Sequence, residues 1–421
     1  MSKKFTSPWT WLPSLYFAQG FPYVIVMTVA VIMFKRLEMS NTDIALYTSS
    51  LYLPWVIKPV WSPLVDILKT KRWWIIVMQI VIGASLGCIA LTLNAPDPFR
   101  YSMAFLWILA FSSATHDIAI DGFYMMAMDQ KKQAYFVGIR NTFYRLAVIA
   151  GQGGLVMLAG HLEKHCSIAH AWSLTFYLAS GIFFLLFVIH HFFLPHPEKE
   201  NTTDTRRKDL KELLMEFIDT FVSFFKKEGI VPALTFILFY RFSEAQLAKI
   251  TSPFLLDPTT TGGLGLSTTT VGFIYGTIGV VTLTAGGIIG GIYISRKGLR
   301  NSLWFMTCAM NIPNIVYLYM ALAQPTNEII ISVCVAIEQL GYGFGFTSLT
   351  YFMILFSAGK QQTAHYAICT GIMALGMMFP GMISGWIQEA VGYQLFFTWI
   401  MLACIPSFIA TAWIRRSHSI K

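Results

Sequence analysis

Two carboxylates and an imidazole stand inside an apolar stretch of this chain, FSSATHDIAIDGF at residues 111–123. They belong to His116, Asp117 and Asp121. A charged residue at membrane depth costs roughly 2.5–3.5 kcal/mol on insertion scales, so one that is retained there is a candidate functional residue. Asp117 and Asp121 are four positions apart and therefore share one face of a helix. The stretch predicts a site that binds ions or transfers protons within a membrane.

The composition indicates the kind of chain that surrounds this site. The 421 residues are 55% hydrophobic and only 12% charged, whereas soluble domains carry about 25% charged residues. A membrane helix needs about 20 mostly apolar residues. Twelve such stretches are present, at residues 11–34, 43–61, 73–93, 100–126, 134–160, 172–194, 231–256, 269–294, 302–323, 328–356, 363–388 and 392–414. We predict an all-α, multi-pass membrane protein whose first span is retained because it is too long for a signal peptide.

The net charge of +9 follows from topology. With both termini in the cytoplasm, nearly all Lys and Arg residues of the loops fall on the cytoplasmic side, as the positive-inside rule requires. The surplus charge therefore does not indicate a nucleic-acid partner. The cysteines form no metal-binding or disulfide pattern. We expect a monomer in the cell inner (cytoplasmic) membrane, with no cofactor and no metal.

A polar linker divides the predicted spans into two sets of six. Residues 196–230 begin with a charged segment and continue from Asp209 with apolar residues at helical spacing, which predicts an amphipathic helix on the membrane surface. The predicted bundles are residues 1–195 and 231–421. QAYFVGI (133–139) and TAHYAIC (363–369) are a weak internal repeat. Parallel repeats around a central site are typical of the major facilitator fold.

Nine charged residues fall inside the predicted spans. They are Lys58, Asp117, Asp121, Arg140, Arg145, Arg241, Glu244, Lys249 and Glu338. Asp121 and Arg140 lie near the cytoplasmic ends of their spans, which favours a gating salt bridge between them. A low-dielectric surrounding favours the neutral form of a carboxyl group, so Asp117, Glu244 and Glu338 are candidate proton carriers. His116 is expected either to hydrogen-bond across helices or to titrate during transport.

The cavity of a major facilitator is lined by its first, fourth, seventh and tenth spans. Here these spans carry Gln19, Asp117, Arg241, Glu244 and Glu338. Together with Lys58, His116 and Arg145, they are our candidates for substrate binding and proton coupling. The excess of fixed positive charge suits a small anionic substrate, so the predicted partners are that anion, protons and the lipid bilayer.

The chain resembles the AmpG muropeptide permeases over most of its length. SATHDIAID (113–121) is similar to their fourth-span signature, and LYFAQGFPY (15–23), FYRFSEA (239–245) and IEQLGYGFGFTSL (337–349) resemble their first, seventh and tenth spans. LPWVIKPVWSPLVD (53–66) is similar to their second span and the following loop, including Lys58 and Asp66. The resemblance implies proton-coupled import, by alternating access, of N-acetylglucosaminyl-anhydro-N-acetylmuramyl peptides for cell-wall recycling. Asp66 joins Asp121 and Arg140 as a gating salt-bridge candidate.

Alternatives remain open. The family has Gln where this chain has His116, and eukaryotic acetyl-CoA transporters share the D-I-A-x-D signature. Transport of another anionic solute, such as an acetyl-CoA-like compound, an amino sugar or a small peptide, is the second hypothesis. His116 and Asp121 also match the H-x4-D pattern of acyltransferases, in which the His is a general base. Since the chain has no soluble catalytic domain, we expect a transporter and not an enzyme.

Overall fold

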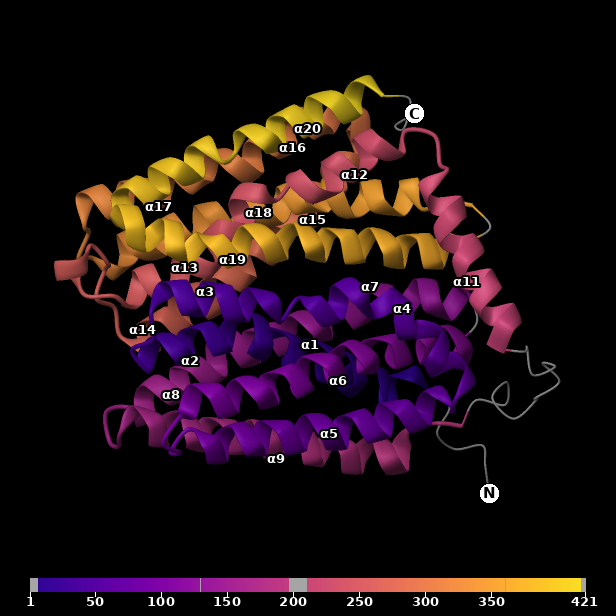
Figure 1. Cartoon of the computed structure of the whole chain (residues 1–421), viewed down its shortest axis with the longest axis horizontal. Coiled ribbons are helices and arrows are strands. Elements are labelled where there is room, and N and C mark those ends of the chain that lie inside the picture. Colours follow the sequence, from indigo (N-terminus) through magenta and orange to yellow (C-terminus); the bar gives the residue numbers. More distant parts are fainter. Residues whose placement is uncertain (1–6, 129, 197–209, 360, 418–421) are drawn as a thin grey trace. The chain divides into compact units, whose positions relative to one another are not determined.

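The structure is a computed structural model that describes residues 7–128, 130–196, 210–359 and 361–417. Within these ranges every regular element is a helix (Figure 1). Large apolar side chains stand exposed along the long helices, among them Leu91, Phe192, Ile329 and Trp386. An exposed apolar surface of this extent is expected of helices that face lipid. The prediction of an all-α membrane protein is confirmed.

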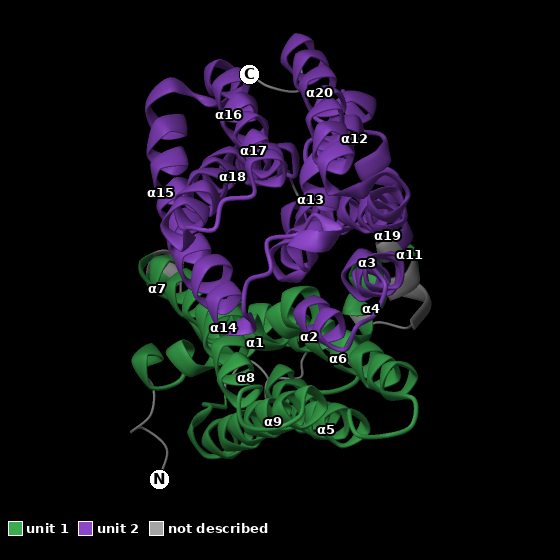
Figure 2. Cartoon of the chain, turned by 90° about the vertical axis from the view of Figure 1, so that its left-hand side faces the viewer, with its two compact units in different colours: residues 1–29, 57–217 green, residues 30–56, 218–421 purple. Residues whose placement is uncertain are grey.

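The first compact unit contains residues 1–29 and 57–217 (Figure 2, green). Its helices are α1 (Leu12–Val24), most of α4 (Leu53–Ile67), α5 (Lys71–Thr92), α6 (Pro98–Ala127), α7 (Gln130–Val148), α8 (Val156–Leu162) and α9 (Ile168–Phe193). Helix α5 packs against both α6 and α9, and α1 packs against α7. Trp11, Leu15 and Phe123 belong to an apolar cluster at the start of α1 and the end of α6.

The second compact unit contains residues 30–56 and 218–421 (Figure 2, purple). Its helices are α2 (Ala30–Arg36), α3 (Asn41–Ser50), the end of α11 (Leu210–Phe225), α12 (Ile230–Phe239), α13 (Phe242–Leu256), α14 (Thr268–Val271), α15 (Val280–Lys297), α16 (Leu299–Asn311), α17 (Ile315–Ala323), α18 (Glu328–Phe356), α19 (Gln362–Leu402) and α20 (Ile405–Arg416). Helices α15 and α16 pack on α18, while α3 and α13 pack on α19. The two bundles predicted from the sequence, residues 1–195 and 231–421, are each one continuous stretch of the chain. Their division by a linker at residues 196–230 stays a prediction.

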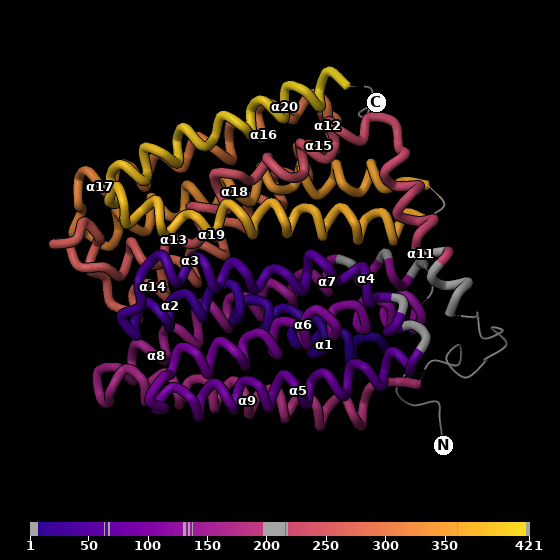
Figure 3. The backbone as a smooth tube through the Cα atoms, in the orientation of Figure 1, coloured from indigo at the N-terminus to yellow at the C-terminus, as the bar shows by residue number. Residues whose placement is uncertain are grey.

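Several predicted spans are interrupted helices. Among the described residues, nine helical segments are long and apolar enough to cross a membrane by themselves. The second span is absent from these nine because it breaks at Leu51–Tyr52, and the seventh because it breaks at Tyr240–Arg241. The eleventh and twelfth spans share one segment, in which Gly392 has a positive φ of 75°. Figure 3 follows the chain from α12 into α13 and from α19 into α20.

The predicted linker helix is present as α11. Within the second unit, the buried ring of Phe224 joins the cluster under α12 and α18. Lys227 Nζ donates to the carbonyl oxygens of Phe356 (2.6 Å) and Ala358 (3.1 Å), which lie at the end of α18. A lysine at a helix C-terminus satisfies carbonyls that have no partner within the helix. Burial in this position lowers the pKa of Lys227.

Small residues let α15 approach the backbone of α18. The sequence contains two GxxxG pairs in this span, Gly286 with Gly290 and Gly287 with Gly291, and the structure places the first pair at the tightest part of the helix contact. A Cβ atom at Gly286 would collide with the carbonyl of Leu340, and one at Gly290 would lie 2.7 Å from the carbonyl oxygen of Phe344. At Gly291 a Cβ atom would meet nothing within 4 Å. Gly286 and Gly290 are therefore needed for the close approach of the two helices, and Gly291 is not.

We expect Gly286→Val to destabilise the protein by about 3 kcal/mol, the upper end of the usual cost of overpacking, because the colliding atoms belong to the backbone of α18 and cannot rotate away. Gly291→Ala is the matched control and should change stability little. The measurement is thermal unfolding of the purified protein in detergent, followed by a thiol-reactive dye on its buried cysteines. Equal unfolding temperatures for the two variants would contradict this account of the contact.

Candidate functional site

An ion pair joins the second and fourth spans within the first unit. Lys58 on α4 holds its Nζ 3.0 Å from Oδ2 of Asp117 on α6, and the two side chains are 21% and 20% exposed. Each charge neutralises the other, which lets both spans carry a charge at membrane depth. The sequence placed the two residues at similar depth without pairing them.

One turn further along α6, Asp121 faces Arg140 on α7. The closest approach is 3.9 Å, from Arg140 Nη1 to Asp121 Oδ1. The guanidinium carbon of Arg140 also lies 5.0 Å from the ring centre of Tyr16 and 5.1 Å from that of Tyr124. Gln19 is close enough to interact with the Asp121 carboxylate. The structure thus brings together three predicted candidates, while their gating role stays a prediction.

His116 belongs to a separate chain of buried polar groups in the same unit. One proton assignment is consistent with the contacts between these groups: the Gln79 amide donates to His116 Nε2 (3.2 Å) and to His190 Nδ1 (2.8 Å). His190 Nε2 then donates to Ser14 Oγ, 2.9 Å away. His116, Gln79 and His190 have no exposed surface. The chain links four spans, which agrees with the interpretation of His116 as an interhelical hydrogen-bond partner.

The acyltransferase hypothesis requires Asp121 to orient His116. In the structure His116 Nδ1 is buried and has no hydrogen-bond partner, and Asp121 Oδ1 is likewise without one. Five residues along a helix rotate two side chains by about 140° from each other, at 3.6 residues per turn. The H-x4-D pattern therefore does not form the general-base arrangement that its chemistry needs.

Two buried carboxyl groups lie within the second unit. Glu244 on α13 is 4% exposed and Glu338 on α18 is 1% exposed. Glu338 Oε2 accepts hydrogen bonds from Tyr317 (3.2 Å) and Gln339 (2.9 Å). Glu338 Oε1 and Glu244 Oε2 are buried without a hydrogen-bond partner. The two carboxyl groups are close enough to repel each other electrostatically.

Arg241 lies at the helix break that separates α12 from α13. Its guanidinium carbon is 4.8 Å from the ring centre of Phe346 and 5.2 Å from that of Tyr342, and its Nη2 donates to the Tyr342 hydroxyl. The guanidinium also interacts electrostatically with Glu244. Cation–π contacts of this kind hold a guanidinium in place without a carboxylate. The break therefore presents a fixed positive charge near Glu244.

The two remaining candidates add little to these clusters. Arg145 is half-buried on α7. Asp66 lies in α4, but its side chain is outside the described residues. Its predicted gating role stays a prediction.

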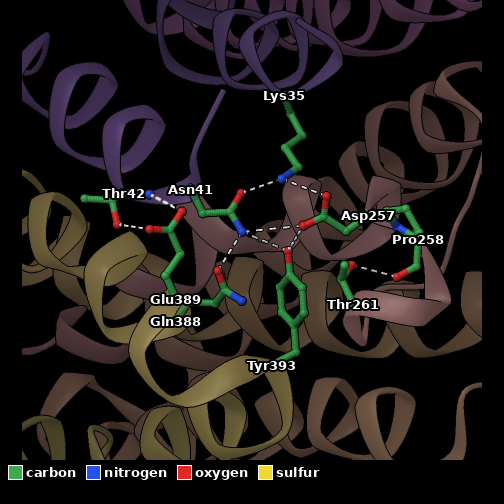
Figure 4. Close-up of polar contacts among 9 residues, drawn as sticks. All are labelled: Lys35, Asn41, Thr42, Asp257, Pro258, Thr261, Gln388, Glu389 and Tyr393. Atoms are coloured by element: carbon green, nitrogen blue, oxygen red, sulfur yellow. Dashed lines mark hydrogen bonds and ion pairs between the residues drawn. The ribbon is translucent and has the colours of Figure 1, made fainter. Parts of the chain in front are cut away.

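Sequence reasoning missed a polar cluster in the second unit, drawn in Figure 4. Lys35 Nζ lies 2.7 Å from Asp257 Oδ1, and the two side chains are each 14% exposed. Both residues stand just beyond an apolar run, where a charge is ordinary. The one sequence feature that could have indicated the pair is the opposite charge of two residues at the ends of the first and seventh spans.

Comparison of the sequence with known protein families gives a result that agrees with the all-helical fold. The family described as Major Facilitator Superfamily matches residues 14–364 of this chain. The chain belongs to this superfamily.

Curated relatives within the superfamily point to the AmpG branch. The putative transporter AmpG 4 of Rickettsia conorii is 24% identical over 408 residues, which cover 94% of each chain. The anhydromuropeptide permease of Escherichia coli K12 is 23% identical over 362 residues, or 84% of this chain and 69% of that protein. The resemblance to AmpG permeases noted in the sequence is therefore confirmed.

Solved structures confirm the major facilitator fold. A bacterial homologue of the human lysosomal transporter Spinster, in an inward-facing and unoccupied conformation, has a TM-score of 0.72 at 15% identity, covering 99% of this chain and 97% of the other. A D-xylose–proton symporter has a TM-score of 0.71 at 12% identity, with 95% and 94% covered. At these identities the likeness concerns the fold alone.

Proposed function

We propose that this chain imports anhydromuropeptides across the cytoplasmic membrane together with protons, for the recycling of cell-wall fragments. The observation that carries the proposal is the similarity to an anhydromuropeptide permease over 84% of this chain, together with the charged residues of the signature SATHDIAID. The orientation is the one that the positive-inside rule favours, with both termini in the cytoplasm.

The Lys58–Asp117 pair gives this proposal a binding step. A muropeptide carries peptide carboxylates, and such a group can replace Asp117 as the partner of Lys58. The exchange becomes favourable when Asp117 takes up a proton, because a neutral carboxyl group no longer holds the ammonium. Proton binding would thus prepare the site for an anion.

The acids of the second unit supply a further place for protons. A buried carboxylate with one oxygen that lacks a hydrogen-bond partner is costly, and a proton removes that cost. Glu244 and Glu338 both meet this description. Since Arg241 lies near Glu244, a cargo anion that engages the guanidinium would change the surroundings of the acids. We assign cargo binding to Arg241 and proton binding to the two glutamates.

The test is uptake of labelled anhydromuropeptide by proteoliposomes, with and without an inward proton gradient. We expect accumulation only with the gradient, and no accumulation in liposomes without protein. If correctly inserted protein takes up no muropeptide under either condition, the proposed cargo is wrong. Competition by coenzyme A esters, amino sugars and short peptides in the same assay would then separate the alternative cargoes.

A further inference from the structure

Lys249 is a buried cation in the middle of α13, within the second compact unit. It is 3% exposed. Its Nζ donates a hydrogen bond to Oγ1 of Thr48 on α3, 3.2 Å away, and lies 5.4 Å from the ring centre of Tyr52, which follows α3. Both partners belong to the same unit as α13. The ammonium therefore contacts two neutral groups of the protein.

These contacts do not balance the charge of Lys249. Among the residues that the structure describes, no carboxylate lies within ion-pair distance of its ammonium. The Thr48 hydroxyl can accept only as a neutral group, since it gives its own hydrogen to the carbonyl of Ile44 (2.7 Å). A tyrosine ring attracts a cation through its face but carries no net negative charge. The ammonium therefore has further hydrogens available for an anion.

Three other cations of the predicted spans each have an acidic neighbour. These pairs are Lys58 with Asp117, Arg140 with Asp121, and Arg241 with Glu244. A buried charge that lacks such a neighbour is costly, and an ionisable residue at membrane depth is a candidate functional residue. We therefore expect the counter-ion of Lys249 to come from a ligand.

Tyrosine side chains connect Lys249 with the candidate site of the second unit. Tyr52, its ring partner, is close enough to Tyr275 to interact with it electrostatically. Tyr275 also interacts with three groups of the candidate site, which are Glu244, Glu338 and Tyr342. The ring of Tyr342 is in turn one of those that hold the Arg241 guanidinium. Lys249 and Arg241 therefore border the same polar interior.

The spacing of the two cations limits what can pair with both. Lys249 follows Arg241 by eight positions, which corresponds to about 12 Å along a helix axis. A ligand with one anionic group can pair with only one of them at a time. A ligand with two carboxylates at about this separation can pair with both at once.

We propose that Lys249 is an anion anchor of the cargo site, and that together with Arg241 it selects cargo with two separated carboxylates. On binding, the ammonium gains the counter-ion that it lacks in the free protein. The proposal rests on the proposed transport function and narrows it. A cargo with several peptide carboxylates meets the requirement, whereas an uncharged amino sugar does not.

Three blocked peptides test the proposal without any muropeptide. They are acetyl-Glu-Ala-Glu-amide, acetyl-Gln-Ala-Glu-amide and acetyl-Gln-Ala-Gln-amide, which differ in the number of carboxylates and hardly in shape. Affinity is measured from the rise of the unfolding temperature of the full-length protein with peptide concentration. We expect the wild type to prefer the dicarboxylate to either other peptide by at least about tenfold, the factor that one well-placed charged hydrogen bond provides.

Substitutions of Lys249 separate its charge from its hydrogen bond. Lys249→Gln can still donate to Thr48 but carries no charge, so we expect it to bind the dicarboxylate no better than the monocarboxylate. Lys249→Met should give the same result and stands in if the first variant does not fold. Lys249→Arg keeps the charge and should keep the preference. Lys297→Gln, at an exposed position of α15, is the control for loss of one lysine and should bind as the wild type does.

Two outcomes overturn the proposal. One is a wild type that does not distinguish the dicarboxylate from the neutral peptide, whether it binds both or neither. The other is a neutral Lys249 variant that keeps the wild-type preference, which would make Lys249 a structural residue. Failure of the proposed cargo is seen separately, as absent uptake of muropeptide by a protein that still prefers the dicarboxylate.

Discussion

The Asp117→Asn substitution is expected to abolish proton-driven accumulation of cargo while exchange of cargo across the membrane continues. Asparagine has the size of aspartate but takes up no proton, so the step that frees Lys58 loses its link to the gradient. Lys58 remains without its counter-ion and open to a cargo carboxylate. We expect accumulation to fall by at least about tenfold, the factor that corresponds to 1.4 kcal/mol. Uptake with a gradient and counterflow without one measure the two activities.

Lys58→Met tests the other half of the pair. A hydrogen bond to a charged group contributes about 1.5–3 kcal/mol, so loss of the ammonium should weaken cargo binding roughly 10- to 100-fold. The double variant Lys58→Met/Asp117→Asn should fold better than Lys58→Met alone, because it leaves no uncompensated carboxylate. Asp219→Asn serves as the control. Gradient-driven accumulation by Asp117→Asn at the wild-type level would remove this pair from the mechanism.

The Glu338→Gln substitution is expected to abolish proton-driven uptake without lowering the stability of the protein. Glutamine keeps the hydrogen bonds from Tyr317 and Gln339 in reach and removes the repulsion with Glu244. Replacement of buried charge by neutral groups is often neutral or stabilising, by about 1–4 kcal/mol. We therefore expect an equal or higher unfolding temperature together with loss of proton-driven uptake, since a stabilised functional site commonly loses activity.

Glu328→Gln, at the exposed start of the same helix, is the matched control for this effect. A surface substitution of this kind should change stability by no more than about 0.5 kcal/mol, and uptake should not change. If Glu338→Gln lowers the unfolding temperature as much as it lowers uptake, the carboxylate is structural. Proton uptake on addition of cargo, measured with a pH-sensitive dye, gives an independent readout of both variants.

Much of the fold follows from the sequence because lipid imposes a simple rule. Every backbone group in the hydrocarbon must be satisfied within its own segment, so long apolar runs predict helices with little ambiguity. The breaks at Leu51–Tyr52 and Tyr240–Arg241 leave no such signal, because a short break is compatible with an apolar run; at the second break Ser407 of α20 donates to the carbonyl of Tyr240. Span counting therefore predicted the twelve spans and missed the irregular geometry within them.

The sequence predicts which charged residues are candidates for the site, but only some of the contacts between them. Depth placed Asp121 beside Arg140 because both lie near the end of adjacent spans. Depth alone could not pair Lys58 with Asp117, since that contact depends on helix rotation. Lys35 and Asp257 were missed because a charge just outside an apolar run is the usual case. Only their burial in the folded chain distinguishes them.

The packing of α3 on α19 also sets an order of events during synthesis. Asn41 bonds to Gln388, a residue 347 positions later in the chain. At 5–20 residues per second, the ribosome makes that partner roughly 17 to 70 seconds after Asn41 has been inserted. During this interval the Asn41 amide group lacks the partners that it has on α19 in the folded protein. Truncation before α19 should therefore leave α3 without the helix that it packs on, and the truncated chain should unfold more readily than the full-length protein.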